Sequence, residues 1–338
     1  MKEVAVVILN WNGKKLLEQF LPVLTACTPS DRAEIIVADN GSTDDSIPFL
    51  KEHYPGISLL LMNENHGFAE GYNRALNQLN HHYFVLLNSD VEVTPGWLTT
   101  SIDYLNAHPE VVALQPKIRS YKEKAYFEYA GASGGYIDIY GYPYCRGRIL
   151  NTVEKDSGQY DEPTEVLWAS GACLFIRSEA YKQAGGLDPY FFAHQEEIDL
   201  CWRLVNRGKK IVCLPSAVVY HIGGATLAME HPRKTFLNFR NNLLMLYKNL
   251  PESHLKKAMI VRFFLDRVAM MQFLLKGYPA NANAVLKARR TFNKKKKDYK
   301  EIRKNNLAES LPGIPPEIYS KSLIFAYYFK KKKKYNEL

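Results

Sequence analysis

The sequence is poor in cysteine, and the few cysteines it has are not arranged in pairs. Five occur among 338 residues, and no two of them form a C-x-x-C motif. This scarcity argues against a disulfide framework and against a zinc ribbon, and it favours a reducing compartment. The five are Cys27, Cys145, Cys173, Cys201 and Cys213.

Long apolar runs are also missing. The apolar segment at the start of the chain stops at Asn10, so it is too short for the hydrophobic region of a signal peptide. No apolar run reaches about 18 residues, and we therefore expect no membrane-spanning helix. Hydrophobic residues nevertheless make up 46% of the chain and charged residues 23%, which is typical of a globular protein and excludes wholesale disorder. The length fits one large domain with an appendage, or two domains.

Acidic residues are scarce in the last quarter of the chain. Residues 253–338 hold 21 lysines and arginines but only 6 aspartates and glutamates, a net charge of +15, whereas residues 1–252 carry −6. The sequence therefore combines an acidic body with a basic tail. Such a tail can bind nucleic acid or an anionic membrane surface, or it can simply be solvated.

The first 90 residues alternate between short apolar runs and helical patterns. The apolar runs are continuous, which predicts strands of a parallel sheet covered by helices on both faces. The expected strands are Val4–Leu9, Ile35–Ala38, Ile57–Met62 and Tyr83–Leu87. Helices are expected after Gly13, over Ser46–His53 and from Phe68 to Leu79.

The pattern is weaker in the middle of the chain and recovers later. Residues 117–163 are rich in tyrosine and glycine, and we expect an irregular or antiparallel insert there. Three later strands, one helix and a helical C-terminal region are expected. These are Ala172–Ile176, Ile211–Leu214 and Ala217–Tyr220, then Glu196–Asn206, and the segment from Pro232 onward.

Polar residues gather where the predicted strands end, which is the edge where α/β sheets bind ligands. Asp39 opens the run of residues 39–45, and its carboxylate is placed to accept a hydrogen bond from a nucleotide base or a ribose. An Asx-turn together with a helix N-cap by Ser42, Thr43 or Asp44 is the structural alternative. Asn88, Ser89 and Asp90 follow the expected strand Tyr83–Leu87. One carboxylate there can hold Mg²⁺ or Mn²⁺ together with a diphosphate, and a polar turn is again the alternative.

Two more candidates lie in the second half. Glu196, Glu197 and Asp199 stand at the start of a predicted helix, where neighbouring carboxylates raise one another's pKa and suit a general base. The same three acids would also complement the helix dipole. His221 follows the last predicted strand, where it is either a metal ligand or a structural histidine.

Taken in order, these segments resemble a family 2 glycosyltransferase of the GT-A fold, in the rhamnosyltransferase-like branch that builds bacterial surface polysaccharides. The resemblance extends from Val4 to Tyr247. The segments that carry it are Val7–Gly13, Val37–Asp44, Asn65–Asn73, Leu87–Asp90, Gly171–Arg177, Gly186–Asp188 and Glu196–Leu200.

The resemblance implies an α/β, Rossmann-like GT-A fold, with a mixed, mainly parallel sheet flanked by helices. Residues 1–250 would form the glycosyltransferase domain, with a nucleotide-sugar half at about 1–115 and an acceptor and catalytic half at about 116–250. Residues 251–338 would form a basic helical extension suited to docking on a membrane surface.

The resemblance also implies roles for individual residues. Asp90 corresponds to the last acid of the D-x-D metal motif, whose first position is Asn88 here, and His221 to the histidine that completes the metal shell. The implied cofactor is Mg²⁺ or Mn²⁺. The residues implied to contact the nucleotide or donor sugar are Asn10, Asn12, Asp39, Gly71, Asn73, Arg74, Asn88 and Ser89.

The implied reaction is an inverting transfer from a nucleoside-diphosphate sugar, with dTDP-rhamnose or a UDP-hexose as the expected donor. Glu197 stands at the position of the family's base and would deprotonate an acceptor hydroxyl, with Asp199 and Glu196 next in line. The implied acceptor is a glycan or a lipid-linked glycan.

The basic tail contains one apolar segment and two lysine runs. Leu255–Leu275 predicts an amphipathic helix in a membrane interface, and Lys294–Lys297 and Lys330–Lys334 are polybasic. We therefore expect a peripheral enzyme on the cytoplasmic face of a bacterial membrane, with an anionic surface as partner and no nucleic acid. A solvated helical appendage is the alternative for the tail.

Two rival functions are less consistent with the sequence. A nucleotidyltransferase of related fold usually needs a glycine-rich, basic loop near the N-terminus, and residues 10–15 lack that glycine density. A non-catalytic nucleic-acid or membrane-binding protein would explain the tail. However, the lysine runs are blocky rather than interleaved with aromatics, and the acidic body is full of site-like residues.

Overall fold

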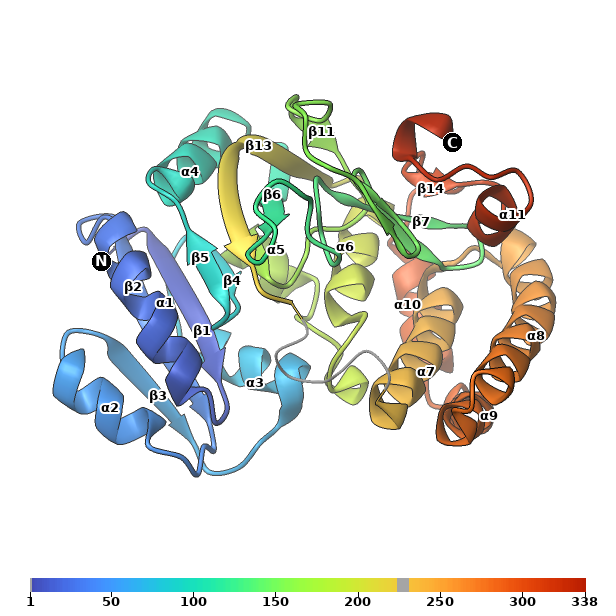
Figure 1. Cartoon of the computed structure of the whole chain (residues 1–338), viewed down its shortest axis with the longest axis horizontal. Coiled ribbons are helices and arrows are strands. Elements are labelled where there is room, and N and C mark those ends of the chain that lie inside the picture. The colour runs from blue at the N-terminus through green and yellow to red at the C-terminus, as the bar shows by residue number, and fades with distance from the viewer. Residues whose placement is uncertain (1, 224–230) are drawn as a thin grey trace.

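The computed structural model describes residues 2–223 and 231–338, which form a mixed α/β fold with two sheets (Figure 1). Within these residues, the main sheet has nine strands in the order β11-β13-β6-β12-β4-β1-β2-β3, with β5 paired to β13. Its strands are β1 Val4–Asn10, β2 Ala33–Asn40, β3 Ser58–Met62, β4 Tyr83–Leu87, β5 Val91–Val93, β6 Val111–Ser120, β11 Thr164–Glu165, β12 Cys173–Arg177 and β13 Lys210–His221.

The N-terminal part follows the predicted alternation of strands and helices. Strand β1 pairs in parallel with β2 and β4, and β2 pairs in parallel with β3. The connecting helices are α1 Lys14–Cys27, α2 Ser46–His53 and α3 Gly67–Leu76. The continuous apolar runs form these strands because the central ones are covered on both faces. The prediction of a mainly parallel, mixed sheet flanked by helices is confirmed.

The sheet is mixed because β12 runs antiparallel to both of its neighbours, β4 and β6. Beyond it, β6 and β13 are parallel to each other. The two strands predicted after residue 210 are one long strand, β13, whose register shifts between Leu214 and Val218, around Pro215. Strand β5, the helix α4 (Trp97–Ala107) and β6 were not predicted from the sequence.

The insert in the middle of the chain is antiparallel, as one of the two predictions for it stated. It forms most of a second, five-stranded sheet in the order β10-β9-β8-β7-β14 among the described residues. Its last strand comes from near the end of the chain and pairs in parallel with β7. The strands are β7 Gly135–Asp138, β8 Pro143–Cys145, β9 Arg148–Ile149, β10 Thr152–Val153 and β14 Ile318–Tyr319.

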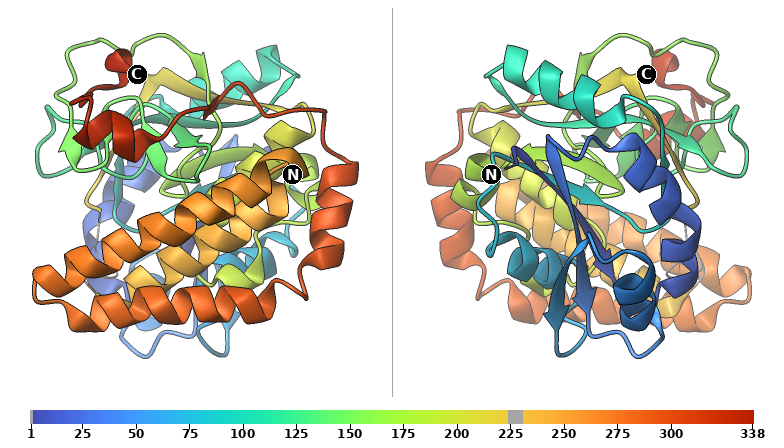
Figure 2. Two further views of the ribbon diagram at one scale, coloured as in Figure 1. Left: turned by 90° about the vertical axis from the view of Figure 1, so that its right-hand side faces the viewer. Right: turned by 90° about the vertical axis from the view of Figure 1, so that its left-hand side faces the viewer.

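Two apolar cores lie on opposite faces of the main sheet. One face packs against α1 and α4, and the other against α3, α5 (Ser178–Gln183), α6 (Glu196–Asn206) and α7 (Pro232–Asn249). Figure 2, right, shows α1 and α4 on the first of these faces. The second core continues into the small sheet, so the insert and the main sheet share one apolar interior.

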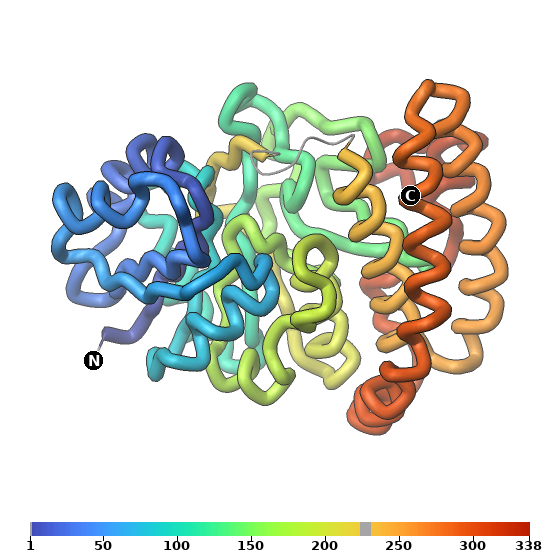
Figure 3. Tube along the Cα trace, turned by 90° about the horizontal axis from the view of Figure 1, so that it is seen from below, coloured from blue at the N-terminus to red at the C-terminus, as the bar shows by residue number. Residues whose placement is uncertain are grey.

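The C-terminal helices form a layer at the end of the molecule opposite β1–β3 (Figure 3). They are α8 Glu252–Leu275, α9 Pro279–Lys295, α10 Lys300–Ala308 and α11 Leu323–Tyr328. None of the helices in the described part of the chain is long and apolar enough to cross a membrane.

Candidate active site

The ends of β1 and β2 carry the first pair of predicted nucleotide contacts. Asn10 and Asp39 are register partners, and Asn10 Nδ2 donates to Asp39 Oδ2 over 2.9 Å. The other oxygen, Asp39 Oδ1, accepts from the Ser42 backbone N–H at 2.9 Å. The turn of the structural alternative is therefore present, but the N-cap of α2 is Asp45 and not Ser42, Thr43 or Asp44. Asn10 Oδ1 is buried and finds no partner within the described residues, so this corner retains an unused acceptor.

Asn12 joins the first loop to the second. It has a positive φ of 51°, a conformation that asparagine tolerates better than most residues. Its Oδ1 accepts from the backbone N–H groups of Thr43, at 2.7 Å, and of Asp44, at 3.2 Å. The Asn12 side chain therefore shapes the loop that follows β2.

Helix α3 brings only one of its three predicted site residues up to the strand ends. A methyl group at Gly71 would lie 2.9 Å from the Leu9 side chain, so a glycine is needed for α3 to approach β1 this closely. Asn73 instead binds the backbone of Leu187 in both directions, at 2.8 and 3.0 Å. Arg74 is exposed and pairs with Glu70 of the same helix at 2.8 Å.

The predicted metal residues do meet in space. Strand β5 pairs with the end of β13 in a register that sets Val91 opposite His221. The neighbouring Asp90 therefore reaches the imidazole, with its Oδ1 at 3.1 Å from His221 Nε2, and Asn88 Nδ2 lies 3.4 Å from the same nitrogen. On the other side of the ring, Glu128 Oε1 lies 3.6 Å from His221 Nδ1.

Two carboxylates set the charge of this histidine. Burial opposes protonation of His221, but hydrogen bonds and charge from Asp90 and Glu128 outweigh burial and raise its pKa to about 10. Without a metal, the ring is therefore an imidazolium between two carboxylates.

The donor set suits a divalent cation. The Asp90 carboxylate and the Asn88 amide converge on one ring nitrogen of His221, and carboxylate and amide oxygens are ligands that Mg²⁺ and Mn²⁺ favour. In the described part of the chain, no three His, Cys, Asp or Glu side chains form a complete metal cluster. A cation held here would therefore need oxygens from a bound phosphate group or from water.

The loop before α6 is strained. Phe192 has φ 64° and ψ −59°, and the Ala193 N–H donates to the Phe191 carbonyl at 2.7 Å, which makes a γ-turn of the rare, positive-φ kind. His194 and Gln195 follow with φ of 70° and 74°. Consecutive non-glycine residues in such conformations persist only where the surrounding structure holds them, and they cluster at functional sites.

Three consecutive polar residues of α7, Arg240, Asn241 and Asn242, hold this loop, and we call them the α7 clamp. Asn241 Nδ2 lies within hydrogen-bonding distance of three loop carbonyls, and Arg240 donates to two. Asn242 Nδ2 donates to Gln195 Oε1 at 3.0 Å. The accepting carbonyls are those of Phe191 (2.9 Å), Ala193 (3.0 Å) and His194 (2.7 Å) for Asn241, and of Tyr190 (2.8 Å) and Phe191 (3.0 Å) for Arg240.

The clamped loop delivers two buried carboxylates at the start of α6. Burial raises the pKa of Glu197 to about 6, partly offset by backbone N–H groups of the first helical turn. Burial and the charge of Glu197 raise the pKa of Glu196 well above its usual range. At neutral pH, Glu197 is therefore mostly ionised. The Oε2 atoms of both residues are buried without partners among the described residues.

Glu197 lies close to the strand-end residues. A methyl group on Gly171 would lie 3.8 Å from Glu197 Cβ, and the next carbonyl, that of Ala172, accepts from the Asn88 backbone N–H at 3.0 Å. Glu197 and Asn88 therefore flank the same short turn. The structure gathers the candidate base, Asn88, Asp90 and His221 along one edge of the sheet.

Asp199 does not join them. It is fully buried in contact with Lys248 (2.8 Å), Arg203 (3.0 Å) and Asn249 (2.9 Å). Although burial opposes ionisation, the charges of Lys248 and Arg203 hold the pKa of Asp199 below its usual value. Asp199 is thus an ion-pair anchor between α6 and α7, and as a replacement base it is poorly placed.

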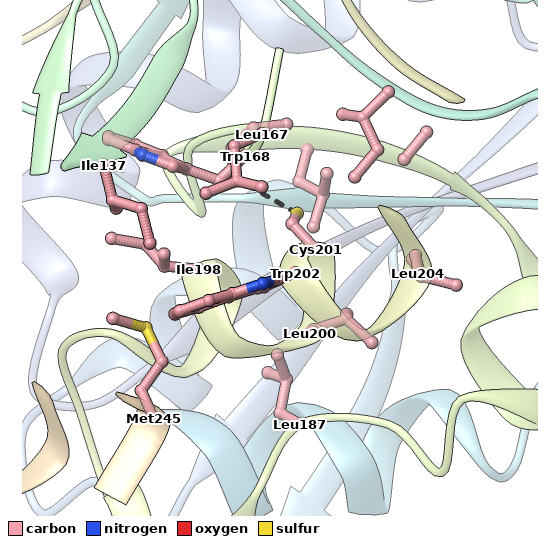
Figure 4. Close-up of a cluster of buried hydrophobic side chains, with 14 of the residues drawn as sticks. Ile137, Leu167, Trp168, Leu187, Ile198, Leu200, Cys201, Trp202, Leu204 and Met245 are labelled. Atoms are coloured by element: carbon pink, nitrogen blue, oxygen red, sulfur yellow. Dashed lines mark hydrogen bonds between the residues drawn. The ribbon is translucent and has the colours of Figure 1, made fainter. Parts of the chain in front are cut away.

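The remainder of α6 is anchored by apolar side chains (Figure 4). Trp202 is completely buried, and Cys201 Sγ lies 4.0 Å from the Ala169 carbonyl. The labelled side chains come from α6 and from the small sheet, α7 and neighbouring loops: Ile198, Leu200, Cys201, Trp202, Leu204, Ile137, Leu167, Trp168, Leu187 and Met245. This core fixes the helix that carries Glu197.

Sequence reasoning missed Glu128 and the α7 clamp. Glu128 lies in the weakly patterned middle, and only the three-dimensional arrangement brings it to His221. The clamp did leave a signal, since three polar residues interrupt the apolar pattern formed by Phe236, Phe239 and Leu243. Polar groups inside a helix that is otherwise packed on a core are usually hydrogen-bonded to something specific.

Comparisons with known proteins show that the chain is similar to glycosyltransferases. The family model described as "Glycosyl transferase family 2" matches residues 5–184. An N-acetylglucosaminyl-diphospho-decaprenol L-rhamnosyltransferase of Mycobacterium tuberculosis is 29% identical over 231 residues, covering 64% of this chain and 75% of the relative. Rhamnosyltransferase WbbL of Escherichia coli is 23% identical over 278 residues, covering 79% of this chain and 98% of the relative.

Solved structures share the fold at low sequence identity. GalNAc-T7 with UDP, GalNAc and Mn²⁺ superposes with a TM-score of 0.57 and 16% identity, covering 73% of this chain and 48% of that protein. Staphylococcus aureus TarS 1–349 in complex with UDP-GlcNAc gives 0.55 and 16%, covering 85% of this chain and 81% of that one.

Proposed function

Because the chain belongs to glycosyl transferase family 2 and is a glycosyltransferase of glycan biosynthesis, we propose that it catalyses an inverting transfer. The donor is a nucleoside-diphosphate sugar, with dTDP-rhamnose or a UDP-hexose favoured because rhamnosyltransferases are among its relatives. The observation that carries the mechanism is the buried Glu197 carboxylate, delivered by a strained loop to the strand-end edge.

The nucleotide is proposed to bind at the ends of β1, β2 and β4. Asn10 retains an unused buried acceptor there, and the loop fixed by Asn12 and Asp39 forms one wall. Ser89 lies at the end of β4, beside Gly13. Gly71 permits the close approach of α3. Asn73 and Arg74 would support α3 and its surroundings instead of contacting the nucleotide directly. Asn73 binds the Leu187 backbone and Arg74 pairs with Glu70.

Asp90 and His221 would hold Mg²⁺ or Mn²⁺, with Asn88 alongside. When bound, such a cation neutralises negative charge that develops on the departing diphosphate.

Glu197 does the proton transfer. Its carboxylate takes the proton of an acceptor hydroxyl while that oxygen forms a bond to the anomeric carbon, and the bond from that carbon to the diphosphate oxygen breaks. Attack from the face opposite the leaving group inverts the anomeric configuration. Burial and the charge of Glu197 raise the pKa of the neighbouring Glu196, which disfavours a state in which both carboxyl groups carry charge.

The proposed acceptor is a lipid-linked glycan. The M. tuberculosis relative is named for a diphospho-decaprenol acceptor, and the lysine-rich tail suits work at an anionic surface. We place the enzyme on the cytoplasmic face of a bacterial membrane, with Lys294–Lys297 and Lys330–Lys334 contributing attraction.

A thermal-shift panel of UDP, dTDP, GDP and CDP, each with and without Mn²⁺, tests the donor site. A ligand that binds only the folded state stabilises it by about 2.7 kcal/mol at a hundredfold excess over its Kd. We expect a metal-dependent rise of the thermal midpoint with one of the four nucleoside diphosphates. Transfer from the matching sugar nucleotide should then give a product of inverted configuration by NMR. Retention of configuration, or no shift with any diphosphate, contradicts the proposal.

A further inference from the structure

Helix α8 exposes large apolar side chains and buries two charged ones. Five of its large apolar side chains point to solvent at spacings of three and four residues, so that they form one stripe along the helix. We call these residues the α8 stripe. They are Ile260 (52% exposed), Phe264 (61%), Val268 (65%), Met271 (51%) and Leu275 (84%).

The inward side of α8 is held by charged groups. Arg262 and Asp266 are both buried, and they pair with each other at 3.0 Å. Asp266 also pairs with Arg289 of α9 at 2.6 Å, and Arg262 donates to the Tyr140 carbonyl at 2.9 Å. Leu255 and Ala258 are also buried, but a surface helix in water normally keeps large apolar side chains such as those of the α8 stripe on its inward face. Apolar patches of this kind mark interaction sites.

Between residues 253 and 297, every exposed charged side chain on α8 and α9 is positive. Between residues 253 and 297 the sequence contains a single acid, Asp266, and that acid is buried. The exposed basic residues on α8 and on α9 beside it are Lys256, Lys257, Arg267, Lys276, Lys287, Arg290 and Lys294. The surface therefore combines an apolar stripe with a cationic rim.

A second apolar group lies on the same side of the molecule. On α11 and just after it, Phe325, Tyr328 and Phe329 are all exposed, and Lys330–Lys334 follow directly. Figure 2, left, shows α8, α9 and α11 together on the side that faces the viewer. The stripe and these aromatics can therefore meet one flat partner at the same time.

On the premise that the proposed acceptor is lipid-linked, we propose that α8 lies in the plane of an anionic lipid surface. The α8 stripe and the α11 aromatics enter the headgroup boundary, and the basic rim contacts the lipid phosphates. A second copy of the chain is a poorer occupant, because pairing two such faces would bring like charges together.

Two hydrogen bonds through Asn242 connect α8 to the loop that carries the candidate base. Arg262 donates from α8 to the Oδ1 of Asn242, and Asn242 Nδ2 binds Gln195, the residue before the candidate catalytic pair. Docking would therefore hold the catalytic loop at a fixed height above the surface that carries the acceptor.

The test is cosedimentation of the full-length chain with vesicles of phosphatidylglycerol and phosphatidylcholine, and with phosphatidylcholine alone. Variants F264E and V268E, combined, should weaken binding to the anionic vesicles at least about tenfold. The matched control is Leu61→Glu, because Leu61 is similarly exposed (56%) but lies on β3 at the opposite end of the molecule (Figure 1). It should bind like the wild type. Circular dichroism and the thermal midpoint verify that each variant folds.

Equal vesicle binding by the double variant and the wild type would overturn the proposal. So would a wild-type dimer in solution that the double variant converts to monomer, since the face would then belong to a second copy. Transfer to a soluble acceptor analogue separates this proposal from the proposed function. Vesicle binding without any sugar transfer would contradict only the proposed enzymatic function. Normal transfer to the soluble acceptor without vesicle binding would contradict only the proposal that α8 docks on lipid.

Discussion

Replacing Glu197 with glutamine should abolish most of the transfer while leaving the donor site intact. The change keeps the size of the side chain and removes its ability to take a proton. A positioned base usually contributes roughly 10²–10⁴-fold to the rate, so kcat should fall by about that factor. The Kd of the nucleoside diphosphate should be unchanged, because the proposed role of Glu197 is toward the acceptor hydroxyl and not toward the diphosphate.

The pH dependence of the wild-type enzyme provides a sharper check. The ionised carboxylate is the active form, so activity rises with pH and levels off above the pKa, which burial raises to about 6. At pH 5.5, about a quarter of the enzyme would carry the active form; with the ordinary glutamate value of 4.5, about nine tenths would. A profile of kcat/KM between pH 4.5 and 8 distinguishes the two.

The neighbouring acid serves as the comparison. Burial and the charge of Glu197 raise the pKa of Glu196 and favour its neutral form, which a neutral glutamine resembles. We expect Glu196→Gln to lose less than about tenfold in kcat, and to lower the pH at which activity declines only slightly. If Glu196→Gln abolishes transfer while Glu197→Gln does not, the base has been assigned to the wrong residue.

Three further outcomes are expected. Asp90→Ala should remove the Mn²⁺-dependent part of the thermal shift given by the nucleoside diphosphate, and an unchanged shift would contradict the metal assignment. Lys248→Met would remove the buried cation that pairs with Asp188 and Asp199. It should lower the free energy of unfolding, measured by urea titration, by about 3–5 kcal/mol. A loss under about 1 kcal/mol would show that Arg203 alone compensates the charge of Asp199. Asn241→Ala should lower kcat about 10–100-fold with an unchanged diphosphate Kd, because the loop relaxes; equal losses in both would point to general unfolding.

The strands of the first half could be predicted from the sequence because their apolar runs are continuous. Strand β4 has the predicted bounds, and helices α2 and α6 begin and end where the sequence placed them. In each case the local pattern and the buried environment agree. A sheet covered on both faces leaves little room for any other interpretation of such runs.

Strand β6 shows where local pattern fails. Its C-terminal half contains Pro116, Lys117 and Arg119, which look like surface residues. Lys117 is nevertheless buried, because it pairs with Asp156 and Asp161 from the insert. Partners about 40 residues away compensate the buried charge, and no local pattern reports them.

The candidate site was predictable to the extent that it follows from strand ends. Parallel neighbours put Asn10 beside Asp39, and the same edge carries Asp90. The meeting of Asp90 with His221 depends on the pairing of β5 with β13, and β5 was not predicted. The sequence also could not show that Asp199 is unavailable as the base. Its ion-pair partners are Arg203, one turn further along α6, and Lys248 of α7.

The parallel pairing of β14 with β7 also sets the order in which the chain can fold. Ile318 pairs with Ile137, so the ribosome must add about 180 residues before the edge of the small sheet finds its partner. At 5–20 residues per second, that delay is roughly 10–40 s. The hydrogen bond that the Leu323 N–H donates to the Asp138 carboxylate, at 2.8 Å, can form only after the same delay. During synthesis this edge is an open strand, a state prone to mispairing, so the yield of active enzyme should depend on chaperones and on the speed of translation.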